Sequence, residues 1–129
     1  MKRRMRALGA ALLLFGLSTL TPAIAADAQG GFTALGQGTD SCTNWSNHRK
    51  AGDWSAPGAW LLGYLTAYNQ FVWKGPDIAD KNKAEEIYKW MDGYCTAHPL
   101  SDLTAAAGQL LIFLNSEHDG AVLQDKLGR

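Results

Sequence analysis

Residues 58–73 form the longest apolar stretch of the chain outside its N-terminus. When this stretch is plotted with the period of an α-helix, apolar side chains occupy most of the circumference, which is typical of a helix surrounded by other helices. Ser55 or Pro57 is a suitable start, since proline is tolerated in the first turn. Gly63 and Ala67 lie four residues apart, so we expect one face to be thin enough for close approach by a neighbouring helix.

Two shorter helices are predicted on either side of this central one. Ser41 is a suitable N-cap for a helix of about two turns that begins at Cys42 and ends before Gly52. Apolar residues at spacings of three and four predict another helix over about 83–97. Asn82 and Glu85 have the spacing of a capping box at its start.

A last helix is predicted after Ser101, which is a good N-cap, with Asp102 in the first turn. Its expected end lies between Asn115 and Gly120, and its expected buried positions are Leu103, Ala107, Leu110, Leu111 and Leu114. We find no strand pattern, internal repeat or second domain. The sequence therefore predicts an all-α fold, a small bundle of four to five helices.

The N-terminus has the order of a cleavable secretory signal. Lys2, Arg3, Arg4 and Arg6 precede an apolar run, and a small-residue site at 23–25 follows it. The apolar run is shorter than the roughly 20 residues that span a bilayer. We expect residues 1–25 to be a signal peptide removed after Ala25, which predicts an exported, periplasmic protein with no stable membrane insertion.

Removal of the signal would change the charge balance. Four of the 12 basic residues and none of the 12 acidic residues lie in residues 1–25, so 8 basic and 12 acidic residues remain, a net charge of −4. No basic stripe remains for nucleic-acid binding. Residues 26–39 contain four glycines and no periodic pattern, which predicts a flexible leader before a helical domain at 40–129.

Cys42 and Cys95 are the only cysteines of the chain. In an oxidising compartment we expect them to form a disulfide. Closing a loop of this length would stabilise the fold by about 4 kcal/mol in the chain-entropy model. Two free thiols or a two-cysteine metal site are the alternatives, although no CxxC or Cys/His cluster accompanies either residue.

Residues for catalysis are hard to find. The three histidines, His48, His98 and His118, have no ligand spacing with a carboxylate, so each is expected to be a polar surface or helix-end residue. Glu85 and Glu86 are adjacent and would point in different directions on a helix. No serine has a nucleophile-elbow context and no glycine-rich phosphate loop is present. We predict a binding protein rather than an enzyme, without metal or cofactor.

Three sequence blocks together carry a family resemblance. They are Ser41-Cys42-x-x-Trp45, the segment WLLGYLTAYN at 60–69, and the segment WMDGYCTAHPL at 90–100. Their order resembles the Rap1a/Tai family of immunity proteins over nearly the whole mature domain. The resemblance implies a periplasmic helical protein, often a homodimer, that protects a bacterium from a type VI secretion effector. The typical effector is a peptidoglycan-cleaving cysteine amidase whose active-site cleft the immunity protein occludes.

A protruding loop is the expected binding element of such an inhibitor. Residues 74–80 combine a Gly-Pro turn with charged side chains beside an aromatic residue. We therefore predict partner contacts by Trp73, Lys74, Asp77 and Asp80. An ordinary solvated connection is the simpler interpretation of this segment. Two other functions remain open: an acid-stress chaperone similar to the HdeA family, and an envelope interaction protein without a toxin partner.

Overall fold

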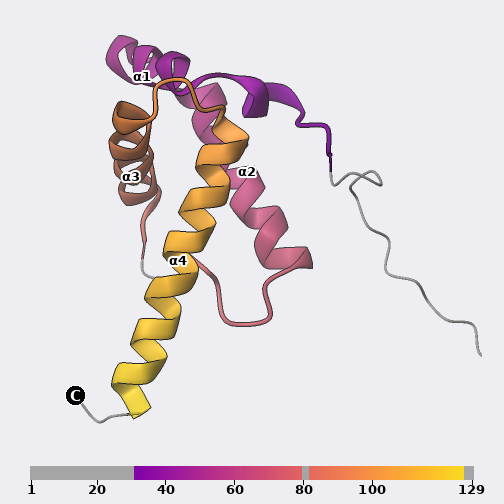
Figure 1. Ribbon diagram of the computed structural model, residues 1–129, viewed down its shortest axis with the longest axis vertical. Coiled ribbons are helices and arrows are strands. Elements are labelled where there is room, and N and C mark those ends of the chain that lie inside the picture. Colours follow the sequence, from indigo (N-terminus) through magenta and orange to yellow (C-terminus); the bar gives the residue numbers. More distant parts are fainter. Residues whose placement is uncertain (1–30, 80–81, 127–129) are drawn as a thin grey trace, which may run out of the picture. The chain divides into compact units, whose positions relative to one another are not determined.

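A computed structural model describes residues 31–79 and 82–126 of the protein (Figure 1). The elements are η1 (Gly36–Thr39), α1 (Cys42–Ala51), α2 (Ser55–Phe71), α3 (Ala84–Ala97) and α4 (Leu103–Lys126). They belong to one compact unit that begins at Thr33. No strand occurs among the described residues, only an isolated bridge between Ser41 and Asp102. The predicted all-α fold is confirmed, whereas the predicted signal peptide lies outside the described residues.

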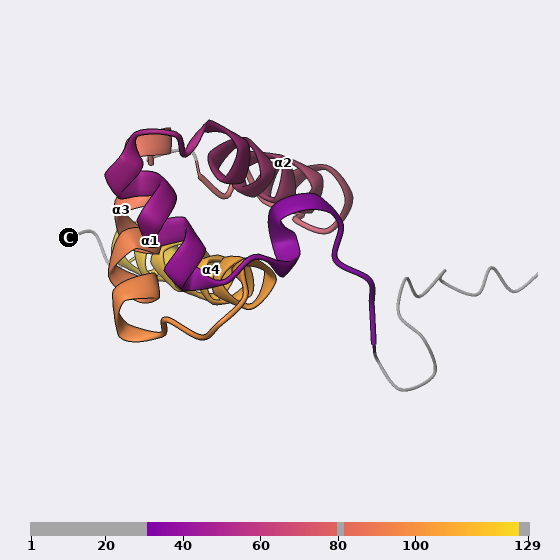
Figure 2. The same cartoon turned by 90° about the horizontal axis from the view of Figure 1, so that it is seen from above.

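A disulfide joins the start of α1 to the last turn of α3. Cys42 and Cys95 are bonded and fully buried, as predicted. The side chain of Ser41 accepts the backbone N–H of Asn44 and caps α1 as expected. Seen from above, α1 lies over α3, against which it packs most extensively (Figure 2). The disulfide therefore closes one end of a tightly packed helix pair.

The central helix of the fold is α4 rather than α2, so the prediction for residues 58–73 was wrong in this respect. Helix α4 contacts η1, α1, α2 and α3. Its buried face contains all five predicted positions and Ala106. Ala106 and Ala107 are fully buried in the first half of this helix.

Helix α2 is covered on one side only. Its buried residues are Pro57, Gly58, Leu61 and Leu65, spaced at three and four. A Cβ atom on Gly63 would meet nothing within 4 Å, and Phe71 at the C-terminal end is 71% exposed. With so few helices in the described chain, no neighbour covers the second face of α2. The close helix approach expected at Gly63 and Ala67 is absent from the described part of the chain.

Three predicted helix boundaries need correction. Asp102 caps α4 in place of Ser101, because its side chain accepts the N–H of Ala105 at 2.7 Å. The carbonyl of Ser101 instead accepts the N–H of Cys42 at 2.8 Å. At the start of α3, the pair Lys83 and Glu86 replaces Asn82 and Glu85, and the N–H of Lys83 donates to the Glu86 carboxylate at 3.0 Å.

Helix α4 also continues to Lys126, beyond the end predicted between Asn115 and Gly120. The polar side chains in that region bond within the helix instead of ending it. The amide of Asn115 donates to the carbonyl of Leu111, and the hydroxyl of Ser116 donates to the carbonyl of Phe113. No proline follows to interrupt the backbone.

The end of the predicted flexible leader is an ordered part of the domain. Residues 36–39 form η1, which packs against α2 and α4. The hydroxyl of Thr104 donates to the carbonyl of Gly38 at 2.8 Å, and the indole of Trp60 donates to the carbonyl of Leu35 at 2.8 Å. Gly38 is buried, and a Cβ atom there would lie 2.5 Å from the Trp60 ring. Only glycine permits this contact, so Gly38 reflects a packing requirement rather than flexibility, while residues 26–30 of the predicted leader lie outside the described residues.

Candidate functional site

The candidate binding element is the segment from Trp73 to Ala79 between α2 and α3, hereafter the 73–79 loop. Trp73 is half-buried, lies 6.3 Å from the ring of Tyr68 in a stacked arrangement, and donates its indole N–H to the carbonyl of Pro76. A Cβ atom on Gly75 would lie 2.8 Å from the Trp73 ring. The chain therefore folds back over its own tryptophan, with Lys74, Gly75 and Pro76 exposed. These three residues are the loop tip.

Asp77 and Asn69 hold the base of the loop together. The amide of Asn69 donates to Asp77 Oδ1 at 2.6 Å, and its carbonyl oxygen accepts the N–H of Ile78 at 2.9 Å. Asp77 Oδ1 also accepts the N–H of Ala79 at 3.0 Å. Ile78 is only 1% exposed and belongs to the main core. The loop is therefore tied to α2 by side-chain hydrogen bonds and to the core by one apolar side chain.

The structure brings three of the four predicted contact residues into this loop. Trp73 forms its floor, Lys74 lies in the tip, and Asp77 shapes the base through Oδ1. Asp80 lies outside the described residues. Partner contact by these residues remains a prediction, but Asp77 has a second role in loop structure that the sequence did not indicate.

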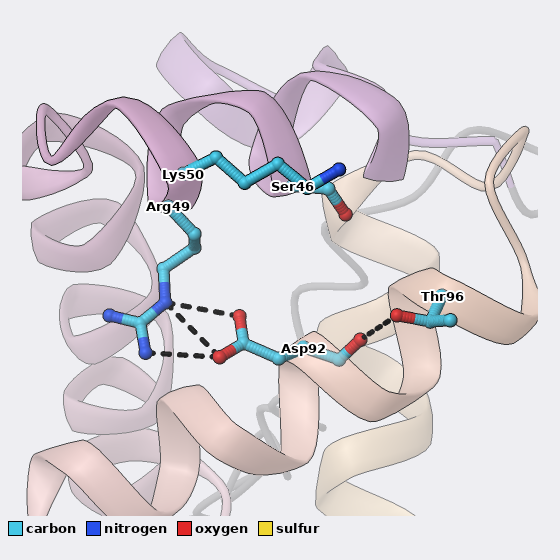
Figure 3. Close-up of a pocket in the computed structure, with 5 residues that line it drawn as sticks. All are labelled: Ser46, Arg49, Lys50, Asp92 and Thr96. Atoms are coloured by element: carbon cyan, nitrogen blue, oxygen red, sulfur yellow. Dashed lines mark hydrogen bonds and ion pairs between the residues drawn. The ribbon is translucent and has the colours of Figure 1, made fainter.

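A second candidate is a hollow of about 380 Å³ between α1 and α3 (Figure 3). The residues that line it are Ser46, Arg49, Lys50, Asp92 and Thr96. In Figure 3 the Arg49 guanidinium points at the Asp92 carboxylate, and the Thr96 hydroxyl donates to the Asp92 carbonyl. Three of these residues come from α1 and two from α3, and all five carry a polar group at or near the end of the side chain.

Arg49 is the main electrostatic link between these two helices. Its Nε and Nη2 donate to the Asp92 carboxylate at 3.0–3.2 Å, and Nη2 also donates to Glu85 at 3.0 Å. The indole of Trp45 donates to the same Asp92 carboxylate at 2.8 Å. The guanidinium carbon lies 4.8 Å from the Trp54 ring centroid, within cation–π range. Both carboxylate oxygens of Asp92 thus accept hydrogen bonds from α1, which ties α1 to α3.

The same cluster shifts two pKa values. The hydrogen bond to Asp92 is the largest cause of the raised pKa of Arg49, and Glu85 contributes in the same direction. Burial raises the pKa of Tyr88, and the negative charge of Glu85 adds to this effect. Both shifts strengthen the normal protonation state at neutral pH. Arg49 therefore stays a cation and Tyr88 a neutral phenol at neutral pH.

Two histidines and both cysteines among the described residues also have local partners. His48 pairs with Asp53 at 2.9 Å, and the His98 ring lies 4.4 Å from that of Tyr94. Both cysteines are in the disulfide. Within residues 31–79 and 82–126, no group of three or more His, Cys, Asp or Glu side chains could hold a metal ion. In the same ranges, no helix is long and apolar enough to cross a membrane.

Comparisons with known proteins do not add to this picture. The chain matches no protein-family model, no curated protein and no solved structure. Its function must therefore be argued from its own residues and from the resemblance given above.

The Arg49 cluster could have been inferred from sequence once the disulfide was predicted. Arg49 lies two turns after Cys42, and Asp92 lies one turn before Cys95. If the disulfide joins two antiparallel helices, the residues after Cys42 lie beside the residues before Cys95. The Arg49 and Asp92 side chains can then meet between the two helices. His118 offered no such signal, because its position depends on where α4 passes the 73–79 loop.

Proposed function

We propose that this chain is an exported inhibitor that protects its own cell by occupying the active-site cleft of a secreted peptidoglycan amidase. The proposal rests on the Rap1a/Tai resemblance and on the predicted signal peptide. The disulfide supports it, since such bonds persist in oxidising compartments such as the periplasm. Inhibition of this kind requires a stable scaffold and a projecting element but no catalytic group.

The preformed 73–79 loop is the observation that carries the proposal. Its tip is exposed while its floor and base are fixed by Trp73, Asn69 and Ile78. Binding through a loop that is already ordered costs less conformational entropy than binding through a flexible one. An inhibitor gains from this arrangement, because the tip can exclude substrate without first having to fold.

The tip also offers distinct chemistry to a partner. Lys74 supplies a cation on a flexible stem, and Pro76 supplies a rigid apolar surface beside it. Asp77 Oδ1 is engaged within the loop, so Lys74 is the better residue to test. A charge reversal there should disturb the interface while leaving the internal hydrogen bonds in place.

Calorimetric titration of the mature protein with an amidase encoded beside its gene tests the proposal. We expect tight binding that Lys74→Asp weakens by roughly tenfold or more, the effect of losing a contact worth about 1.4 kcal/mol. Lys89→Asp is the matched control, since Lys89 is an exposed lysine on α3. Equal affinities for the two variants would exclude the loop tip.

One further variant separates the two candidate surfaces. Lys50 lines the hollow between α1 and α3, so loss of binding in Lys50→Asp alone would place the interface there.

Absence of amidase binding, together with protection of client proteins in strong acid, would instead favour the HdeA-like chaperone function. Neither outcome is expected under the present proposal.

A further inference from the structure

The outer half of α4 lies beside the 73–79 loop. Leu114 is the last fully buried residue described in this helix, at 1% exposure. One residue later, the amide of Asn115 donates to the hydroxyl of Tyr68 at 3.3 Å, and the Tyr68 ring stacks on Trp73. One turn further along, His118 reaches the loop itself. Helix α4 therefore extends past the core along the side of the loop.

His118 contacts the chain on both sides of the loop tip. Its Nε2 lies 3.2 Å from the carbonyl oxygen of Asp77, which follows the tip. Its ring centroid lies 5.4 Å from that of Trp73, which precedes the tip. A carbonyl oxygen can only accept, so this hydrogen bond requires a proton on Nε2. One side chain of α4 thus holds both ends of the exposed segment.

The contacts that α2 makes with the loop cannot fix its position relative to α4. Asn69 bonds to Asp77 and Ile78, so it fixes the fold of the loop base, and Trp73 follows directly from the same helix. Among the described residues, His118 is the side chain of α4 that makes a polar contact with the loop. His118 therefore fixes the orientation of the loop relative to α4, whereas Asn69 fixes it relative to α2.

We infer that His118 is a positioning residue for the 73–79 loop, and that α4 beyond Leu114 acts as the strut that carries it. As far as binding is concerned, this inference rests on the proposed function. The orientation of the loop can be measured without any partner, so the two ideas can fail separately.

Amide hydrogen exchange by NMR tests the positioning role directly. In His118→Ala, we expect the N–H groups of Ile78 and Ala79 and the Trp73 indole to exchange roughly two- to tenfold faster, the range expected for loss of one neutral hydrogen bond. Glu117→Ala is the matched control, since Glu117 is an exposed neighbour on α4. It should leave these rates unchanged.

A conservative variant separates the hydrogen bond from a general effect on the helix. In His118→Gln, a donor nitrogen lies the same number of bonds from the backbone as His118 Nε2. We expect most of the protection to return. Unchanged exchange in His118→Ala, or equally fast exchange in the alanine and glutamine variants, would overturn the inference.

Binding supplies the second readout. Against the amidase, affinity should fall roughly two- to tenfold in His118→Ala, in proportion to the faster loop exchange, and recover in His118→Gln. If the wild-type protein binds no amidase while the exchange results hold, the proposed function fails and the positioning role stands. If the wild-type protein binds the amidase while exchange is unchanged in His118→Ala, the positioning role fails and the proposed function stands.

Discussion

Two glycine-to-alanine substitutions should change stability in opposite directions. A Cβ atom on Gly38 would lie 2.5 Å from the Trp60 ring and 2.7 Å from the Thr104 hydroxyl. A Cβ atom on Gly63 would meet nothing within 4 Å. Neither residue has a positive φ angle, so backbone strain does not distinguish them. The two positions differ in the space available for a methyl group.

The magnitudes follow from these surroundings. Overpacking costs about 1–3 kcal/mol, and displacing Thr104 would also weaken its hydrogen bond to Gly38, worth about 1 kcal/mol. Gly38→Ala should therefore lower the free energy of unfolding by about 2–3 kcal/mol, or Tm by roughly 10–20 °C. Alanine at the open helical position Gly63 should raise the free energy of unfolding by about 0.5–1 kcal/mol.

Thermal unfolding of the oxidised mature protein, followed by circular dichroism, measures both effects. A neutral Gly38→Ala variant would mean that η1 does not pack on α2, which would contradict the fold described above. A Gly63→Ala variant that loses more than about 1 kcal/mol would mean that the outer face of α2 is covered. Dependence of Tm on protein concentration would then identify a second copy as the cover.

Four further predictions concern the link between α1 and α3. Cys42→Ser should lower the stability of the oxidised protein by up to about 4 kcal/mol and leave the reduced protein nearly unchanged, as measured by urea denaturation with and without reductant. Asp92→Asn should cost about 1.5–3 kcal/mol, because it removes the charged acceptor of Arg49 and Trp45. Glu85→Gln should cost less than about 1 kcal/mol, since its side chain is 58% exposed; equal urea midpoints for the two variants would contradict the assignment. Tyr88 has a raised folded-state pKa, so its contribution is complete below the unfolded pKa of about 10 and is lost as pH rises through the folded value. Tyr88→Phe should therefore lose less stability than the wild type between about pH 9 and 11, measured by the same denaturation.

The helices themselves could be predicted because their signals are local. Ser41 caps α1, and the apolar stripe of α3 has the spacing of its buried face. The disulfide followed from having only two cysteines in a chain with a predicted secretory signal. The helix signals are local, and the disulfide has only one possible pairing, so the sequence was sufficient for both.

The errors have a common physical cause. Aromatic residues such as Trp60 and Phe71 made α2 look buried on all sides, although apolar side chains are common on protein surfaces. Which helix becomes central depends on how all four helices pack, and α4 is the one that contacts each of the others. Gly38 suggested flexibility, yet its role is to admit the Trp60 ring. Local pattern could not separate these cases.

The candidate site was only partly predictable for the same reason. The turn residues of the 73–79 loop marked its position, and Lys74 is exposed there. The internal bond of Asp77 to Asn69 and the contact of His118 join residues eight and 41 positions apart. Such pairs become visible only when the path of the chain is known.

The most direct test of the proposed function is periplasmic co-expression with the amidase encoded beside this gene, scored by cell lysis. The account predicts that the wild-type protein and Lys89→Asp prevent lysis, whereas Lys74→Asp, expressed at the same level, does not. Lysis in the presence of folded wild-type protein, or full protection by Lys74→Asp, would contradict it.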